Sequence, residues 1–396
     1  MGRIGLYGGT FNPPHIGHMQ AAKQAICALS LDCLILMPTR ISPHKVLPEG
    51  SASPEQRLRM LQIASSGLEK VQVSDLELSR EGVSYTYQTV LALREQYPAD
   101  ELVLLMGTDM FLSFENWKNP DIILANASLG VFYRGEKGEK DAIAAQKQRM
   151  EISGSKIYLV ENPVVDISST ELRRLIAFRC ADSNLPKGVG EYIRKEGLFC
   201  TADNLRDLSM DALEQKVTGL LKPNRVAHVL GCRDTAIELA KLYGVDETDA
   251  ARAGLLHDIT KALTPAQQLT LCRDYGILLD DFSRENPKTL HALTGSLVAE
   301  RIFGETPAVV QAIRWHTTGK ADMNTLEKII YVADYMEPNR DFPGVEELRR
   351  LAYSDLNKAL LLGLTMTTQL LEKNGQVISP GSMEALAWLR SAAVSI

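Results

Sequence analysis

The spacing of apolar residues changes near the middle of this 396-residue chain. In the first half, apolar runs of strand length (4–7, 33–37, 102–106, 129–133 and 157–160) alternate with segments of helical spacing (20–29, 54–64, 86–96 and 141–150). From about residue 208 onward, helical spacing continues almost throughout, and no alternating strand pattern stands out. The change predicts two domains, residues 1–200 and 205–396, with the boundary inside 197–208.

Each half indicates its own fold class. Alternating strands and helices favour an α/β fold, a doubly wound parallel sheet with helices on both faces, and ligands of such sheets bind at the carboxyl ends of the strands. The second half is predicted to be an all-α domain.

Composition limits the class of partner. The net charge is −6 and neither half has a basic excess, which argues against a nucleic acid polymer as ligand and favours small molecules. No uncharged apolar run reaches the roughly 18–20 residues that a membrane span needs, and glycines and polar residues enter the N-terminus too early for a secretory signal. The six cysteines are scattered without a CxxC pair. We therefore expect a cytoplasmic protein with reduced thiols and no membrane partner.

A glycine-rich segment near the N-terminus has the features of an anion site. Residues 4–18 read IGLYGGTFNPPHIGH, which predicts a buried strand, a turn and the start of a helix. Gly8 and Gly9 allow the backbone to approach a ligand closely, so that backbone N–H groups can face phosphate oxygens. His15 and His18, three residues apart, share one face of the helix, whose N-terminus adds positive potential. Turn, helix and imidazoles are thus predicted to converge on one anion.

A second segment with phosphate-binding chemistry lies at residues 167–173, ISSTELR. Ser168 to Thr170 are predicted to form a helix N-cap that offers hydroxyls and free backbone N–H groups. Arg173, one turn later, can contact phosphates through its guanidinium fork.

These two segments resemble the motifs of the nucleotidylyltransferase superfamily, whose hallmark HxGH is present at residues 15–18. Further segments at 43–45 (PHK), 84–86 (SYT) and 106–109 (MGTD) are similar to those of nicotinate-nucleotide adenylyltransferases, and the resemblance covers nearly all of residues 3–199. Asn12 stands where many relatives have Asp, and Ser42 where many have Pro.

The resemblance implies a Rossmann-like fold and transfer of AMP from ATP, with Mg²⁺, to nicotinate mononucleotide, giving deamido-NAD and pyrophosphate in NAD biosynthesis. It implies catalytic roles for His15, His18 and Arg173, stacking of Trp117 on the pyridine ring and a ribose contact from Asp109. The substrate-binding residues that it implies are Gly8, Gly9, Thr10, Phe11, His44, Lys45, Tyr85, Thr86, Gly107, Asp109, Trp117, Arg134, Ile167, Ser168, Ser169 and Thr170. Nicotinamide mononucleotide and phosphopantetheine are alternatives to nicotinate mononucleotide as the acceptor of AMP.

The second half carries six potential metal ligands on predicted helices: His228, His257, Asp258, His291, His316 and Asp334. Neutral imidazole and carboxylate suit iron, manganese and related divalent ions, and side chains of several helices can converge inside a bundle. His257 and Asp258 are adjacent, so that they could ligate one ion from two sides or let the carboxylate bridge two ions.

The order H…HD…H…H…D resembles that of the HD phosphohydrolase superfamily. The stretches 253–261, 313–319 and 328–338 are similar to those of HD-type symmetrical bis(5′-nucleosyl)-tetraphosphatases, over about residues 208–390. This resemblance implies hydrolysis of diadenosine tetraphosphate to two ADP with iron or another divalent metal, one or two ions. It implies four primary ligands (His228, His257, Asp258 and Asp334), with His291 and His316 completing a second ion and Asp258 in a catalytic role. Lys261, Arg314 and Arg340 are candidate phosphate contacts.

The sequence thus favours a bifunctional enzyme that acts on small nucleotides. Another nucleotide, such as a guanosine alarmone or a dNTP, remains an alternative substrate of the second domain. That domain could instead be a non-catalytic nucleotide sensor. Both a monomer and a homodimer are compatible with the sequence.

Overall fold

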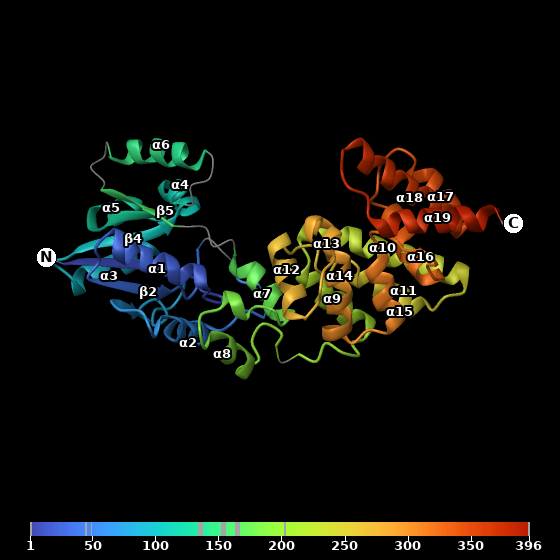
Figure 1. Cartoon of the computed structure of the whole chain (residues 1–396). Helices are drawn as coiled ribbons and strands as arrows, with labels where there is room; N and C mark the ends of the chain where they lie inside the picture. The colour runs from blue at the N-terminus through green and yellow to red at the C-terminus, as the bar shows by residue number, and fades with distance from the viewer. Residues whose placement is uncertain are drawn as a thin grey trace. The chain divides into compact units, whose positions relative to one another are not determined.

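The structure, a computed structural model, describes residues 2–43, 46–48, 50–133, 138–151, 156–162, 167–201 and 203–394. By internal contacts the chain divides into two compact units, Met1–Asp203 and Asn204–Ile396 (Figure 1).

The first unit is built on a parallel sheet of six strands in the order β3-β2-β1-β4-β5-β6. The strands are β1 (Arg3–Gly9), β2 (Cys33–Pro38), β3 (Val71–Val73), β4 (Glu101–Gly107), β5 (Ser128–Tyr133) and β6 (Ile157–Glu161). This topology confirms the predicted doubly wound α/β fold. The sequence pattern missed β3, because three partly exposed residues are too short to show a strand period. The strand order reverses between β1 and β4, and such a reversal opens a crevice at the carboxyl ends of these strands.

Helices cover both faces of this sheet (Figure 1). The described helices of the unit are α1 (Ile16–Ala28), α2 (Pro54–Ser65), α3 (Thr86–Gln96), α4 (Thr108–Leu112), η1 (Phe114–Asn116), α5 (Pro120–Asn126), α6 (Glu139–Glu151), α7 (Ser169–Ala177), η2 (Asp182–Asn184) and α8 (Val189–Lys195). Alternate strand residues enter two separate cores, as a strand buried on both faces requires. Leu34 and Leu36 of β2 pack with Ala22 of α1, whereas Ile35 of β2 packs on the other face with Val90 of α3.

The second unit is helical in all its described elements, which confirms the predicted all-α half. They are α9 (Met210–Leu220), α10 (Pro223–Tyr243), α11 (Glu247–Leu256), α12 (Pro265–Asp274), α13 (Asp281–Glu285), η3 (Pro287–Thr289), α14 (Leu290–Val298), η4 (Ala299–Phe303), α15 (Pro307–Trp315), α16 (Thr325–Met336), α17 (Val345–Ala352), α18 (Leu356–Lys373) and α19 (Pro380–Val394). The long α10 begins with a proline in its first turn and ends at Gly244, whose φ of 69° suits a helix C-cap. It packs against α11 and α16, and α15 packs against α14 and α16.

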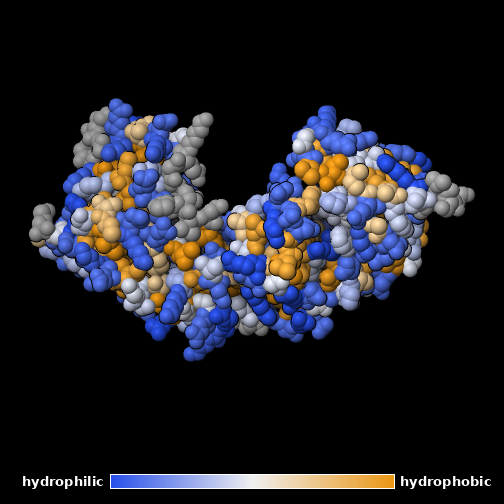
Figure 2. Space-filling model, viewed as in Figure 1, coloured by the Kyte–Doolittle hydropathy of each residue, from blue (hydrophilic) through white to orange (hydrophobic). Residues whose placement is uncertain are grey.

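Figure 2 shows one face of the molecule, on which hydrophobic residues form separate patches among hydrophilic ones. Among the described helices, none has both the length and the hydrophobicity to cross a membrane.

Candidate functional sites

Residues 8–12, which are the last two residues of β1 and the turn that follows it, are called the glycine turn below. Phe11 in this turn has a φ of 46°, in the left-handed region, and only 1% of its surface is exposed. A Cβ added to Gly9 would lie 3.2 Å from the Phe11 ring, whereas one added to Gly8 would meet no atom within 4 Å. Gly9 therefore permits tight packing of the turn and Gly8 leaves its outer side open. The side chain of Phe11, a predicted substrate contact, belongs to the core, so such a contact would involve its backbone.

His15 and His18 lie together at the start of α1. His15 is the N-cap residue and His18 lies in the first turn, with ring centroids 3.7 Å apart. The backbone N–H of His15 donates to Nδ1 of His18 over 3.1 Å. Nδ1 of His18 is thus an acceptor, so that the proton of the neutral ring is on Nε2. Burial lowers the pKa of His15 to about 4, which keeps its imidazole neutral near pH 7.

The start of α7 contacts the glycine turn, although more than 150 residues separate them in the sequence. Arg173 donates from Nη1 to the backbone oxygen of Asn12 (2.8 Å), and Ser169 donates from Oγ to that of Pro13 (3.2 Å). Ser168 is the N-cap of α7 and accepts from the backbone N–H of Glu171. Nη2 of Arg173 donates to Oγ1 of Thr170 over 3.0 Å. The structure thus brings the two predicted phosphate motifs together.

The other predicted residues of the first site lie on separate elements. Gly107 is the N-cap of α4, with Asp109 exposed in its first turn, and Thr86 begins α3 after its N-cap Tyr85. Trp117 is half-buried, with its ring 5.3 Å from that of Phe114, and Lys118 places Nζ 4.2 Å from the ring centroid of Tyr85. Ile167 is buried. His44, Lys45 and Arg134 lie outside the described residues.

Sequence reasoning missed Arg57 on α2, which donates from Nη1 to the backbone oxygen of Thr10 over 2.8 Å. A signal for it exists. Arg57, Met60 and Leu61 follow the i, i+3, i+4 spacing of a buried helical stripe, in which arginine is unusual.

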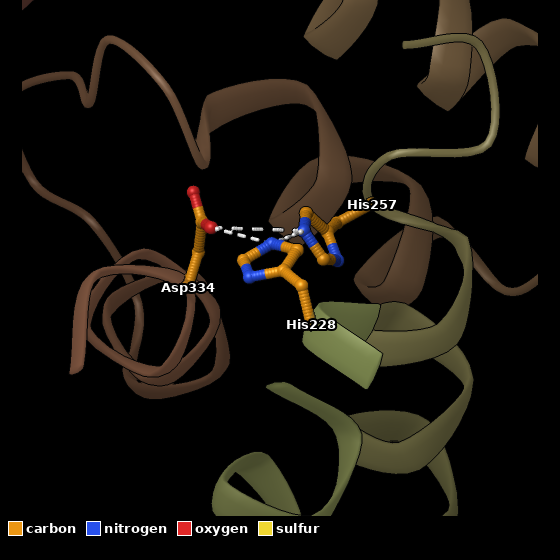
Figure 3. Close-up of side chains that lie close together, drawn as sticks. All are labelled: His228, His257 and Asp334. Carbon is orange, nitrogen blue, oxygen red and sulfur yellow. Dashed lines mark hydrogen bonds and ion pairs between the residues drawn. The ribbon is translucent and has the colours of Figure 1, made fainter. Parts of the chain in front are cut away.

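The six predicted metal ligands of the second unit converge at the point where five helices meet. They form the histidine–aspartate cluster: His228 from α10, His257 and Asp258 directly after α11, His291 from α14, His316 directly after α15 and Asp334 from α16. Figure 3 shows the first part of it, in which Oδ1 of Asp334 is 3.1 Å from Nε2 of His228 and 3.8 Å from Nε2 of His257. In the second part, the Nε2 atoms of His291 and His316 are 3.2 Å apart.

Asp258 lies between the two parts. Its Oδ2 is 3.6 Å from Nε2 of His257 and 3.8 Å from that of His228. Its Oδ1 is 3.5 Å from Nε2 of His291 and 3.8 Å from that of His316. One carboxylate thus faces all four imidazoles.

Each histidine of the cluster is oriented through its other ring nitrogen. The Nδ1 atoms of His257, His316 and His291 lie 2.7, 2.7 and 2.9 Å from the backbone oxygens of residues 254, 313 and 288. Nδ1 of His228 lies 3.0 Å from Oε1 of Glu337. Because these oxygens only accept, Nδ1 carries the proton and Nε2 presents a lone pair to the cluster.

Burial and charge determine the protonation of the cluster. Burial lowers the pKa of His291 to about 3 and that of His316 to about 4, so both are neutral near pH 7. Burial alone would raise the pKa of Asp334, but nearby positive charge, including that of Arg340, whose Nη2 donates to Oδ1, outweighs burial and holds that pKa well below its usual range. The pKa of Asp258 is lowered in the same way against the effect of burial.

This donor set fits a divalent cation. The cluster combines imidazole lone pairs with ionised carboxylates, and two overlapping groups, His228–His257–Asp334 and His257–Asp258–His316, have ligand atoms within 4.8 Å of one another. Oδ1 of Asp258 is buried and has no hydrogen-bond partner among the described residues. A cation would satisfy it, so we identify the cluster as a candidate metal centre.

Cationic side chains surround the cluster. Arg340, a predicted phosphate contact, donates from Nη2 to Oδ1 of Asp334 (2.7 Å), and Nζ of Lys261 lies 2.9 Å from Nε2 of His291. The third predicted contact, Arg314, lies over Trp315, with its guanidinium carbon 5.5 Å from the ring centroid. In the described contacts, Arg314 does not bind any of the six ligands.

Three further residues at this centre escaped sequence reasoning. Arg225 donates from Nε to Oδ2 of Asp258 (2.6 Å), and Oγ1 of Thr317 lies 3.1 Å from Nε2 of both His291 and His316. The third is Glu337. The available signal was spacing, since Arg225 precedes His228 by three residues and Glu337 follows Asp334 by three, which places each pair on one side of a helix.

Comparisons with known proteins match each unit separately. The cytidylyltransferase-like family matches residues 6–175, and the HD domain family matches residues 225–339. A symmetrical bis(5′-nucleosyl)-tetraphosphatase of Halalkalibacterium halodurans is 42% identical over 173 residues, which are 42% of this chain and 92% of that protein. A probable nicotinate-nucleotide adenylyltransferase of Borreliella afzelii is 34% identical over 204 residues, 51% of this chain and all of that protein. A solved structure described as a predicted HD superfamily hydrolase involved in NAD metabolism from Clostridium acetobutylicum is 39% identical, with a TM-score of 0.46, and the match covers 47% of this chain and 98% of that one.

Proposed function

Because the chain belongs to the nicotinate-nucleotide adenylyltransferases through its first unit and to the HD-domain symmetrical bis(5′-nucleosyl)-tetraphosphatases through its second, we propose that it is a bifunctional enzyme. The first unit adenylylates nicotinate mononucleotide with ATP, giving deamido-NAD and pyrophosphate. The second unit hydrolyses diadenosine tetraphosphate to two ADP.

The first proposal is supported above all by the contact of Arg173 with the glycine turn beside the two adjacent imidazoles of His15 and His18. The attacking phosphate of the mononucleotide is already an anion, so the reaction needs alignment and charge neutralisation more than a general base. His18 would donate from Nε2 to a phosphate oxygen of ATP, at the positive end of α1. Arg173 and the backbone N–H groups at the start of α7 would hold the phosphates from the other side. Mg²⁺ that enters with ATP would neutralise further charge.

The second proposal is supported above all by the convergence of the six ligands, among which the buried Oδ1 of Asp258 has no hydrogen-bond partner in the described part of the chain. A divalent ion held there, which we propose to be iron, would supply Lewis-acid chemistry for phosphoanhydride hydrolysis. The chain's own residues would orient the substrate, with Lys261, Arg314 and Arg340 as candidate contacts to its phosphates. The positions of Lys261 beside His291 and of Arg340 beside Asp334 support two of these three assignments.

The first activity is tested with the full chain and ATP, with three acceptors side by side: nicotinate mononucleotide, nicotinamide mononucleotide and phosphopantetheine. We expect pyrophosphate to be released much faster with nicotinate mononucleotide than with the other two acceptors. His18→Ala should lower kcat by about 10²–10³-fold, the usual effect of removing one preorganised donor, with an unchanged circular dichroism spectrum. Preference for another acceptor, or near-normal turnover of the variant, would disprove this assignment.

The second activity is tested with a panel of diadenosine tetraphosphate, a guanosine tetraphosphate alarmone and a dNTP, after metal analysis of the purified protein. We expect iron in the protein and ADP as the product from diadenosine tetraphosphate. Tight binding without turnover would instead identify a nucleotide sensor, and cleavage without any bound metal would exclude the proposed chemistry. The His18→Ala chain is the matched control here, because it should keep this second activity.

A further inference from the structure

The guanidinium of Arg57 is buried inside the first unit, and no acidic side chain among the described residues pairs with it. Only 1% of Arg57 is exposed. Nη1 donates to the backbone oxygen of Thr10 (2.8 Å) and Nη2 to that of Arg40 (3.3 Å), while Nε has no hydrogen-bond partner among the described residues. In the described part of the chain, no ion pair includes Arg57. Within the described ranges, the side chain thus contacts two backbone carbonyls and no carboxylate.

A buried charge without a counter-charge is costly, and carbonyl dipoles compensate it only in part. Burial accordingly lowers the pKa of Arg57, although arginine remains protonated at any physiological pH. The exposed carboxylate of Glu55 opposes this effect and raises the pKa of Arg57 by electrostatic attraction, without a hydrogen bond between the two side chains among the described contacts. For packing alone, α2 does not need a charge at this position, because an apolar side chain of similar length would fill the same space.

The two carbonyls that Arg57 holds belong to two different loops at the carboxyl edge of the sheet. Thr10 follows Gly8 and Gly9 in the glycine turn, where ATP phosphates would bind. Arg40 lies in the loop after β2, and its backbone N–H donates to Oγ of Ser84 over 3.2 Å.

Arg40 extends this link toward α3. Its Nη1 donates to the backbone oxygens of Leu78 (2.9 Å) and Arg80 (3.0 Å). The next residues after Ser84 are Tyr85 and Thr86, which the mononucleotide is proposed to contact. Arg57 therefore connects the proposed ATP side of the site to the proposed mononucleotide side.

We propose that Arg57 is a positioning residue for adenylyl transfer. Its buried charge attracts the phosphates of ATP to the glycine turn. Its two hydrogen bonds set the spacing between that turn and the loop after β2. The inference rests on the proposed function of the first unit. In this proposal the phosphates of the bound nucleotide supply the negative charge that balances Arg57. The two charges interact across the backbone of the glycine turn, where water screens them only weakly.

The test uses the full chain with Arg57→Met, which keeps the length of the side chain and removes its charge, and Arg57→Lys, which keeps the charge and loses the fork. Arg59→Met is the matched control, since Arg59 is exposed on the same helix two residues later. For each chain we would measure KM for ATP, KM for nicotinate mononucleotide, kcat and the midpoint of thermal unfolding without nucleotide.

We expect Arg57→Met to raise KM for ATP at least about tenfold, because the charge of one group a few ångströms from the phosphates is lost. The midpoint of unfolding should fall only modestly, through the loss of two hydrogen bonds. Arg57→Lys should keep KM for ATP within about threefold of wild type while kcat falls, because the charge stays and the spacing of the loops is lost. Arg59→Met should match wild type. A merely structural role would instead lower the midpoint of unfolding and the active fraction and leave KM for ATP unchanged.

An unchanged KM for ATP in Arg57→Met, or an equal change in Arg59→Met, would overturn the inference. If Arg57→Met does not fold, Arg57→Lys decides: wild-type values of both KM and kcat, or a tenfold higher KM for ATP, would contradict the role. Failure of the proposed function is recognised separately, since the wild-type chain would then not adenylylate nicotinate mononucleotide at all.

Discussion

The guanidinium of Arg173 donates to the backbone carbonyl of Asn12 across 161 positions of sequence, over 2.8 Å. Asn12 is itself fully buried, with Nδ2 donating to Oγ of Ser51 (2.8 Å) and Oδ1 accepting from the backbone N–H of Ala52 (3.2 Å). The carbonyl that orients Arg173 is therefore anchored from two sides. Arginine has five N–H donors, so this contact and the one to Thr170 leave others for a phosphate.

Replacement of Arg173 by lysine should lower kcat/KM for ATP by about 10–100-fold, because lysine cannot donate to Asn12, Thr170 and a phosphate at once. Arg174→Lys, one position along the same helix, is the control and should stay close to wild type. Steady-state kinetics with pyrophosphate detection would measure both. Equal losses in the two variants would show that α7 needs arginine for packing and not for this contact.

Asp258→Asn should abolish hydrolysis of diadenosine tetraphosphate and reduce bound metal in the same preparation. The amide has one acceptor in place of two charged oxygens, so it cannot serve both parts of the histidine–aspartate cluster. Metal analysis and an ADP-release assay on one sample would show whether the two losses occur together. Adenylyl transfer by the same protein serves as the folding control, and full metal content with no activity would contradict a ligand role.

Glu337→Gln should weaken metal binding by about 10–100-fold, although Glu337 is not one of the six ligands. Its Oε1 orients His228, and its Oε2 accepts from both the backbone N–H and Nδ2 of Asn339 at 2.8 Å, where an amide NH₂ would meet two donors. Glu327→Gln is the matched control, since Glu327 is equally buried at the other end of α16 but pairs with Lys320. Chelator competition titrations would compare the two variants.

Gly231→Ala offers a second route to the same effect. A Cβ at residue 231 would lie 2.4 Å from Oε2 of Glu337, so the carboxylate would have to move away from its position beside His228. Wild-type metal affinity in this variant and in Glu337→Gln would show that His228 does not depend on Glu337.

Stability of the first unit should fall as pH is lowered from about 6.5 toward 4. The pKa of His15 is about 4 in the folded chain, against an ordinary value of 6.5 when unfolded, so the unfolded chain takes up a proton first. Between pH 7 and pH 5 this difference corresponds to about 2 kcal/mol of unfolding free energy. Urea unfolding of wild type and His15→Gln at both pH values would measure it, because other titrating groups cancel in the comparison. Equal pH dependence in both chains would mean that the pKa of His15 is not lowered in the folded state.

Much of the fold could be predicted from the sequence, because the pattern of apolar residues that marks a strand or a helix lies within one short segment. Apolar runs of strand length and the helical period of 3.6 predicted the parallel sheet and the all-α half, and of the described strands the short β3 was missed. The likeness of residues 15–18 and 167–173 to known motifs indicated the chemistry of the first site in the same way. His44, Lys45 and Arg134 remain predictions, since they lie outside the described residues.

By itself, the sequence determined which residue types are present and which of them share one face of one element. Only the tertiary structure decided which faces meet. It placed the carboxylate of Asp258 among four imidazoles from four separate segments, set Glu337 behind His228, and put the buried guanidinium of Arg57 against the carbonyl of Thr10 in the glycine turn. The physical reason is that such contacts depend on how whole helices and strands pack, and the pattern of residues along one element does not contain that information.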